Sequence, residues 1–129
     1  MNRNIAPRKI TLALADDFDI QRNIMSALIA KCSAFELVAL AAHGRDLISK
    51  LDRLPSAPEV CILDLHMPEM DGITTATILS SKYPSIKLFG YTTEINTQSI
   101  DQFRRHGALH VFPKDKPQDM LAAIKRHVT

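Results

Sequence analysis

Five hydrophobic runs, each bounded by charged or turn-forming residues, divide the chain. Each run is apolar at successive positions, a pattern typical of parallel strands that are covered on both faces. The fourth run is weakened by Gly90, which offers no side chain to pack. We therefore predict strands at residues 9–15, 35–41, 60–63, 86–91 and 110–113.

Between these runs, apolar residues return at helical spacing. In the first such segment Ile20, Ile24, Ala27 and Leu28 recur on one face, and Asp19 is placed as the N-cap. Prolines follow the second and third segments and open the fifth, where proline is favoured in the first turn. We predict helices at residues 19–31, 45–54, 73–83, 95–106 and 117–128.

The alternation of five strands and five helices with short connections predicts an α/β fold, a doubly wound parallel sheet with right-handed crossovers. At 129 residues the chain has the length of one ordinary domain. We expect a single domain over residues 1–129, with a polar arm at residues 1–8 and no output domain in this chain. Ligands of such folds bind outside the carboxyl ends of the strands.

Composition narrows the classes of function. Hydrophobic residues make up 46% and charged residues 23% of the chain, and no apolar run approaches the roughly 20 residues that cross a bilayer. The N-terminal residues lack a secretory signal, so we expect a cytoplasmic location without membrane contact. A net charge of +2 and the absence of tryptophan argue against direct nucleic-acid binding. Cys32 and Cys61 have no partner at metal-binding spacing and are interpreted as reduced core residues.

Polar residues stand at the carboxyl ends of four predicted strands: Asp16 and Asp17, then Asp64, then Thr92, then Lys114. Each alone has an ordinary interpretation, as a helix cap, a turn residue, a strand residue or a surface lysine. Together they converge on one edge of a parallel sheet. Three carboxylates there repel one another and are tolerated when a cation such as Mg²⁺ lies among them. Mg²⁺ leaves positions open for phosphoryl oxygens while a carboxylate attacks phosphorus.

The sequence DLHMPEMDG at residues 64–72, with the acidic pair and Phe18 upstream and Lys114 downstream, resembles the receiver domains of two-component response regulators. The resemblance spans about residues 9–128. It implies a flavodoxin-like sheet with strand order 2-1-3-4-5 and five helices. It also implies a switch controlled by phosphorylation rather than an enzyme, which at most accepts a phosphoryl group and slowly loses it to water.

The resemblance implies a role for each acidic residue. Asp64 matches the phosphoacceptor, which takes its phosphoryl group from a sensor histidine kinase or a phosphotransfer protein. Asp17 matches the direct Mg²⁺ ligand, and Asp16 contributes mainly through water. Asp64 itself and the backbone carbonyl of His66 complete the protein ligands.

Other matches concern the phosphoryl group after transfer. Lys114 matches the lysine that pairs with it, and Thr92 matches the switch hydroxyl that moves toward its oxygens. His66 and Glu94 occupy positions that the resemblance links to the rate of dephosphorylation, through the attacking water. The alternative for these two is that they are exposed loop residues with no special task.

The chain departs from the family pattern at three positions. Val111 stands where the family often has an aromatic switch residue, and valine has no ring to swing inward. Thr93 is larger than the usual residue there, and we expect it to slow phosphorylation by small donors. Asp115 after the lysine resembles the nitrate-response, LuxR-type subgroup, whose members usually carry a C-terminal helix-turn-helix and regulate transcription.

Partner surfaces are predicted less sharply. Ile100, Phe103, Leu121 and Ile124 are interpreted as core residues of the fourth and fifth helices, so we expect partners at the polar flanks of these helices. The resemblance also allows a homodimer through the face formed by the fourth helix, fifth strand and fifth helix.

Two other functions compete with the switch. Asp17 and Asp19, with Phe18 between them, faintly resemble the paired aspartates of haloacid dehalogenase-like Mg²⁺ phosphatases, but Gln21 stands where that family has threonine. A pseudo-receiver that binds partners without phosphorylation is suggested by Val111 and Thr93, but the complete acidic site argues against it.

Overall fold

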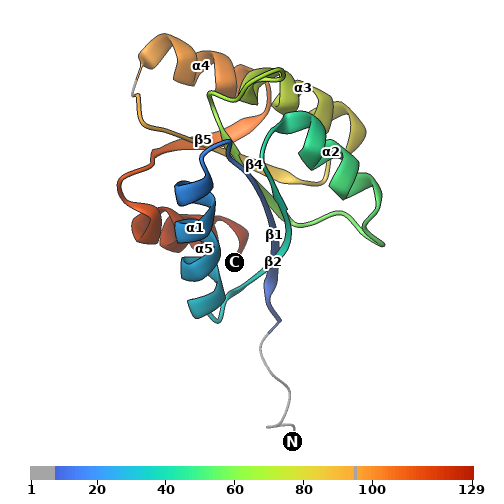
Figure 1. Cartoon of the computed structure of the whole chain (residues 1–129), viewed down its shortest axis with the longest axis vertical. Coiled ribbons are helices and arrows are strands. Elements are labelled where there is room, and N and C mark those ends of the chain that lie inside the picture. The colour runs from blue at the N-terminus through green and yellow to red at the C-terminus, as the bar shows by residue number, and fades with distance from the viewer. Residues whose placement is uncertain (1–7, 95) are drawn as a thin grey trace, which may run out of the picture.

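The structure is a computed structural model that describes residues 8–94 and 96–129 (Figure 1). Within these residues five strands alternate with five helices. The strands are β1 (Ile10–Ala15), β2 (Phe35–Ala41), β3 (Val60–Asp64), β4 (Lys87–Thr92) and β5 (Ala108–Pro113). The helices are α1 (Asp19–Lys31), α2 (Gly44–Asp52), α3 (Gly72–Lys82), α4 (Thr97–Arg105) and α5 (Pro117–Val128).

All neighbouring strands are parallel, in the order β2-β1-β3-β4-β5. This confirms the predicted doubly wound sheet and its strand order. The register aligns the strand ends, because Ala15 pairs with Leu63 and Asp64 pairs with Tyr91. The residues at and just after the ends of β1, β3 and β4 therefore meet at one edge, next to the point where strand order reverses.

The core consists of two apolar clusters, one on each face of the sheet. Helices α1 and α5 cover one face, through Met25 and Ile124 among others, and α2, α3 and α4 cover the other (Figure 1). Fully burying a side chain such as Leu14 or Ile62 stabilises the fold by about 1.5–3 kcal/mol each. Coverage on both faces explains why the strands are continuous apolar runs. No helix in the described part of the chain is long and apolar enough to cross a membrane.

The predicted apolar face of α1 was wrong at Ile20, Ile24 and Ala27, which are exposed, and right at Leu28, which packs half-buried against the core. Met25 and Ile29 are the buried residues of this helix, whereas Ile20 is 68% and Ile24 44% exposed. Ile24 is one residue from Met25 and so lies roughly 100° away from it around the helix. Asp19 is also not the N-cap: Phe18 holds that position without a side-chain cap.

Other element boundaries differ from the prediction by one or two residues, and side-chain caps account for the starts of α3 and α4. The side chain of Asp71 accepts a hydrogen bond from Thr74 N at 2.8 Å, so α3 begins one residue earlier than predicted. Asn96 caps α4 in the same way, and the predicted start at residue 95 lies outside the described residues. Helix α2 ends at Asp52 rather than 54, β4 is shifted by one residue, and β5 starts at 108 rather than 110.

The predicted core positions of the last two helices are confirmed. Phe103, Leu121 and Ile124 are buried, and Ile100 is half-buried against the same core. Cys61 is buried in β3, whereas Cys32 follows α1 and is half-buried; both are free thiols.

Candidate functional site

Asp16 follows β1 directly and is completely buried. Its backbone N–H donates to Ala41 O at 3.0 Å, which extends the pairing of β1 with β2 by one residue. Its Oδ1 accepts from Phe18 N at 2.9 Å, and its Oδ2 accepts from the hydroxyl of Tyr91. A buried carboxylate needs such donors, because an unpaired charge away from water is strongly destabilising.

Asp64 ends β3 and is 3% exposed. Its Oδ1 accepts from His66 N at 3.1 Å, and its Oδ2 lies 3.1 Å from Lys114 Nζ. Burial raises the pKa of Asp64 from 3.8 to about 7; the Lys114 charge opposes this rise and the Asp16 charge adds to it. The carboxyl group is therefore poised to change charge near neutral pH, which is typical of functional groups.

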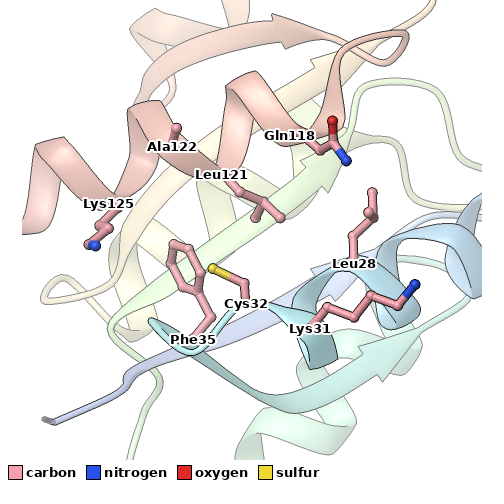
Figure 2. A pocket seen from close by; sticks show the side chains of 8 residues that line it. All are labelled: Leu28, Lys31, Cys32, Phe35, Gln118, Leu121, Ala122 and Lys125. Atoms are coloured by element: carbon pink, nitrogen blue, oxygen red, sulfur yellow. The ribbon is translucent and has the colours of Figure 1, made fainter.

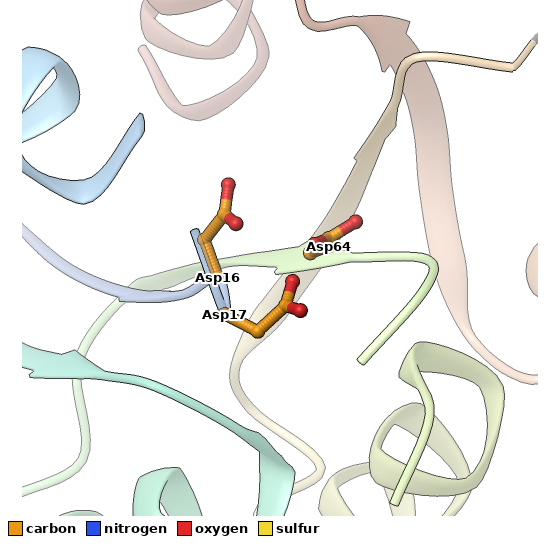
Figure 3. A group of neighbouring side chains, drawn as sticks. All are labelled: Asp16, Asp17 and Asp64. Carbon is orange, nitrogen blue, oxygen red and sulfur yellow. The ribbon is translucent and has the colours of Figure 1, made fainter. Parts of the chain in front are cut away.

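Asp17 completes an acidic cluster with the other two aspartates (Figure 3). One carboxylate oxygen of each lies within 4.8 Å of the others, and Asp17 is exposed while its two neighbours are buried. Carboxylate oxygens from one open and two buried side chains suit a hard divalent cation that keeps several waters. The three predicted metal-binding acids are thus brought together.

Lys114 joins the cluster from the end of β5. Its backbone N–H donates to Thr92 O at 3.0 Å, which ties it to β4. Its Nζ lies 3.0 Å from Asp16 Oδ2 and 3.1 Å from Asp64 Oδ2, and the side chain is 12% exposed. The ammonium group therefore offsets part of the repulsion between two buried carboxylates.

Tyr91 is a site residue that sequence reasoning missed. It is completely buried on β4, its hydroxyl donates to Asp16 Oδ2, and the Lys114 ammonium lies 4.8 Å from its ring centroid. Burial, and the hydrogen bond to Asp16, raise the pKa of Tyr91 far above its ordinary value, so the hydroxyl stays protonated and donates. The one signal in the sequence is a phenol inside a buried run, since a buried tyrosine hydroxyl needs a partner.

Thr92 and the exposed residues His66 and Glu94 also lie at the carboxyl edge of the sheet, but not all of their side chains face the acidic cluster. Thr92 is completely buried; its Oγ1 accepts from Glu94 N at 3.1 Å and donates to Glu94 O at 3.2 Å. His66 is exposed and contributes its backbone N–H to Asp64. Val111 is buried in the cluster beneath α4, away from solvent.

The turn between β3 and α3 requires a glycine at its end and a left-handed backbone at one other residue. Gly72 N donates to Leu65 O at 3.1 Å, and a Cβ at Gly72 would lie 2.4 Å from Asp64 O. Only glycine allows this close approach, which brings the start of α3 directly against the end of β3. Glu69 within the same turn has a φ of 65°.

A groove of about 360 Å³ lies between α1 and α5 (Figure 2). Leu28, Cys32, Phe35 and Leu121 line it, with lysines at its rim. None of the clustered acids borders it. The groove therefore lies apart from the chemistry at the strand ends.

Residues 12–125 match the profile of the response regulator receiver domain family. Transcriptional regulatory protein LnrK of Bacillus subtilis is 26% identical over 112 residues, which cover 87% of this chain and 50% of that protein. A protein-glutamate methylesterase/protein-glutamine glutaminase of Oceanobacillus iheyensis is 29% identical over 108 residues, which cover 83% of this chain and 30% of that protein. The chain thus spans half or less of the length of these curated relatives.

Solved structures share the fold. The signal receiver domain of the putative response regulator NarL from Mycobacterium tuberculosis has a TM-score of 0.82 against this chain at 19% identity, covering 93% of this chain and 98% of that one. At this identity the likeness concerns the fold alone.

Proposed function

Because the chain belongs to the response regulator receiver domain family, we propose that it is a phosphorylation-controlled switch with Asp64 as its phosphoacceptor. The observation that carries the proposal is the position of Lys114, whose ammonium bridges Asp16 and Asp64 at 3.0 and 3.1 Å. The ends of three strands thereby bring two carboxylates and one ammonium group within contact distance, and this arrangement supports the proposed roles.

The proposed reaction is transfer of a phosphoryl group from a phosphohistidine. An oxygen of the ionised Asp64 carboxylate forms a bond to phosphorus, the bond from phosphorus to the imidazole nitrogen breaks, and the imidazole takes up a proton. The product is an acyl phosphate. Burial raises the pKa of Asp64 to about 7 in the metal-free site, and a cation at the acidic cluster would favour the ionised carboxylate that acts as nucleophile.

Mg²⁺ is the cation that we propose for the acidic cluster. Asp17 and Asp64 would hold it directly, Asp16 mainly through water, and the backbone carbonyl of His66 would complete the protein ligands. When bound, the ion supplies neutralisation of charge on the phosphoryl oxygens. The observation in favour is the three carboxylate oxygens within 4.8 Å of one another.

After transfer, Lys114 is the group that we expect to pair with the phosphoryl oxygens. It is a compact point charge, already desolvated and within hydrogen-bond distance of the acceptor. Thr92 would act as the switch, exchanging its bonds to Glu94 for the phosphoryl group. His66 and Glu94 are exposed beside the site, where they would influence the attack of water on the acyl phosphate. Val111 would take no part in an aromatic step.

The proposed phosphodonor is a sensor histidine kinase or a phosphotransfer protein, and the proposed location is the cytoplasm. We propose that residues 1–129 form one receiver domain with no enzyme activity beyond phosphoryl acceptance and slow loss. Its output is proposed to be transcription regulation, by analogy with the name of LnrK. The relative from Oceanobacillus iheyensis is instead named a protein-glutamate methylesterase/protein-glutamine glutaminase. We further propose that the face formed by α4, β5 and α5 serves a homodimer.

The position of Asp19 argues against the competing interpretation as a phosphatase. This residue lies in α1, is 84% exposed and pairs with Arg22 rather than joining Asp16 and Asp64. The paired aspartates of that reading are therefore not brought together at the site.

The decisive experiment is intact mass spectrometry after incubation with acetyl phosphate and Mg²⁺. Wild type should gain one phosphoryl group, Asp64→Asn should gain none, and the matched control Asp19→Asn should behave as wild type. No gain in wild type would favour a phosphorylation-independent receiver. Repeated hydrolysis that survives Asp64→Asn but not Asp17→Asn would favour a phosphatase.

A further inference from the structure

Tyr91 connects two members of the site through one side chain. Its hydroxyl donates to Asp16 Oδ2, and its ring lies beneath the Lys114 ammonium, 4.8 Å from nitrogen to centroid. The residue precedes Thr92 on β4 and is completely buried. The other tyrosine, Tyr83, lies away from the acidic cluster: its hydroxyl donates to Asp52 at the α2–α3 side of the molecule.

The contacts of Asp16 show what the hydroxyl does. Its Oδ1 accepts from Phe18 N at 2.9 Å, and its Oδ2 accepts from Tyr91 and lies 3.0 Å from Lys114. The carboxylate is completely buried, so these donors set its orientation. When Lys114 turns to a phosphoryl group, the Phe18 N–H and the Tyr91 hydroxyl remain to hold Asp16.

Packing alone does not call for a tyrosine at this position. Phe89 and Leu14 fill the same apolar cluster with hydrocarbon side chains. A buried hydroxyl is destabilising unless it is bonded, so its presence among these residues is explained by the bond to Asp16.

We propose that Tyr91 is a positioning residue of the metal site, which holds Asp16 in the orientation that serves a magnesium ion at the acidic cluster. The inference rests on the proposed function. Hydrogen-bond partners of directly ligating groups fix ligand orientation, and their loss typically lowers metal affinity about 10–100-fold. Asp16 would act on the ion mainly through water, so the effect of its partner Tyr91 is expected at or below the low end of that range.

The test begins with Tyr91→Phe in the full chain. This change keeps the ring, its packing and its contact with Lys114, and removes only the hydroxyl. We expect Mg²⁺ affinity, measured by isothermal titration calorimetry, to fall by up to about tenfold, because Tyr91 would act on the ion through Asp16 and its water. Tyr83→Phe is the matched control, because it removes the other tyrosine hydroxyl away from the site and should leave the affinity unchanged.

A second measurement follows the hydroxyl directly. The chain has two tyrosines and no tryptophan, so Tyr91 is the sole near-ultraviolet reporter of its kind in the Tyr83→Phe protein. We expect Mg²⁺ to shift its tyrosine absorbance with the midpoint that calorimetry gives. Because it uses the Tyr83→Phe protein, this measurement tests the role of Tyr91 even if Tyr91→Phe does not fold.

The outcomes separate the two proposals. Unchanged or tighter Mg²⁺ binding by folded Tyr91→Phe, or a tyrosine spectrum that saturating Mg²⁺ leaves unaltered, overturns the role of Tyr91 while the proposed function stands. Failure of wild type to bind Mg²⁺ overturns both.

Discussion

The Lys114 ammonium lies 3.1 Å from Oδ2 of Asp64, in a position where 12% of the lysine side chain and 4% of the aspartate side chain are exposed. Charges this far from water interact more strongly than surface pairs do. Burial raises the pKa of Asp64, and the lysine limits that rise. The same contact marks where phosphoryl oxygens would meet a cation.

Lys114→Ala should therefore slow phosphorylation of Asp64 by roughly a hundredfold, because the transferring group loses a preorganised cation. The rate is measured by intact mass at successive times with acetyl phosphate and Mg²⁺. Lys116→Ala is the matched control, since Lys116 is exposed two positions along the chain and should retain the wild-type rate. Equal slowing by both changes would contradict a specific role for Lys114.

The stability of the metal-free protein should depend on pH through Asp64. Burial raises the folded pKa from 3.8 to about 7, so the folded state keeps a proton that the unfolded state loses in this range. The contribution is fully present below roughly pH 4 and is lost as the pH rises through about 7, by at most about 1.4 kcal/mol per pH unit. Urea unfolding with chelator across this range measures it. Asp64→Asn should lack this slope, and parallel curves for the two proteins would refute the assignment.

Much of the site could be predicted because parallel strands bring their carboxyl ends to one edge. Asp16, Asp64 and Lys114 are far apart in sequence, but each directly follows or ends an apolar run. The fold therefore places the Lys114 ammonium 3.0 Å from the carboxylate of Asp16 and 3.1 Å from that of Asp64. The repeated pattern, rather than any single residue, carried the prediction.

Two features could not be predicted because they depend on tertiary contacts. Tyr91 sits in an apolar run and counts there as a core residue, and only the partner across the sheet reveals its hydroxyl bond to Asp16. The face of α1 was misjudged because Ile20 and Ile24 have the spacing of a buried stripe, but the sheet contacts Met25 and Ile29 instead. Helical periodicity does not tell which of two apolar stripes is covered.

Gly90→Ala should destabilise the fold by about 1–3 kcal/mol. A Cβ at this position would lie 2.2 Å from Cε2 of the completely buried Phe103, so the ring and α4 must shift. Equilibrium urea unfolding measures the loss. Combining it with Phe103→Leu should cost less than the sum of the single changes, because the smaller side chain makes room; strict additivity would show that the two residues do not compete for this space.

Thr92→Val should separate phosphorylation from its structural consequence. The hydroxyl of Thr92 is bonded to the backbone of Glu94 at 3.1 and 3.2 Å, and a switch role requires it to leave these bonds for the phosphoryl oxygens. Valine keeps the shape without the hydroxyl, so Asp64 should still be phosphorylated, while a rearrangement of α4 that depends on the Thr92 hydroxyl should be lost. Amide NMR spectra with and without beryllofluoride, which stands in for the phosphoryl group on Asp64, measure this. The chemical-shift changes should reach α4 and β5 in wild type and in Thr92→Ser, which keeps a hydroxyl. In Thr92→Val they should stay near the strand ends. Shifts of equal reach in all three proteins would mean that the signal leaves the site by a route that does not use Thr92.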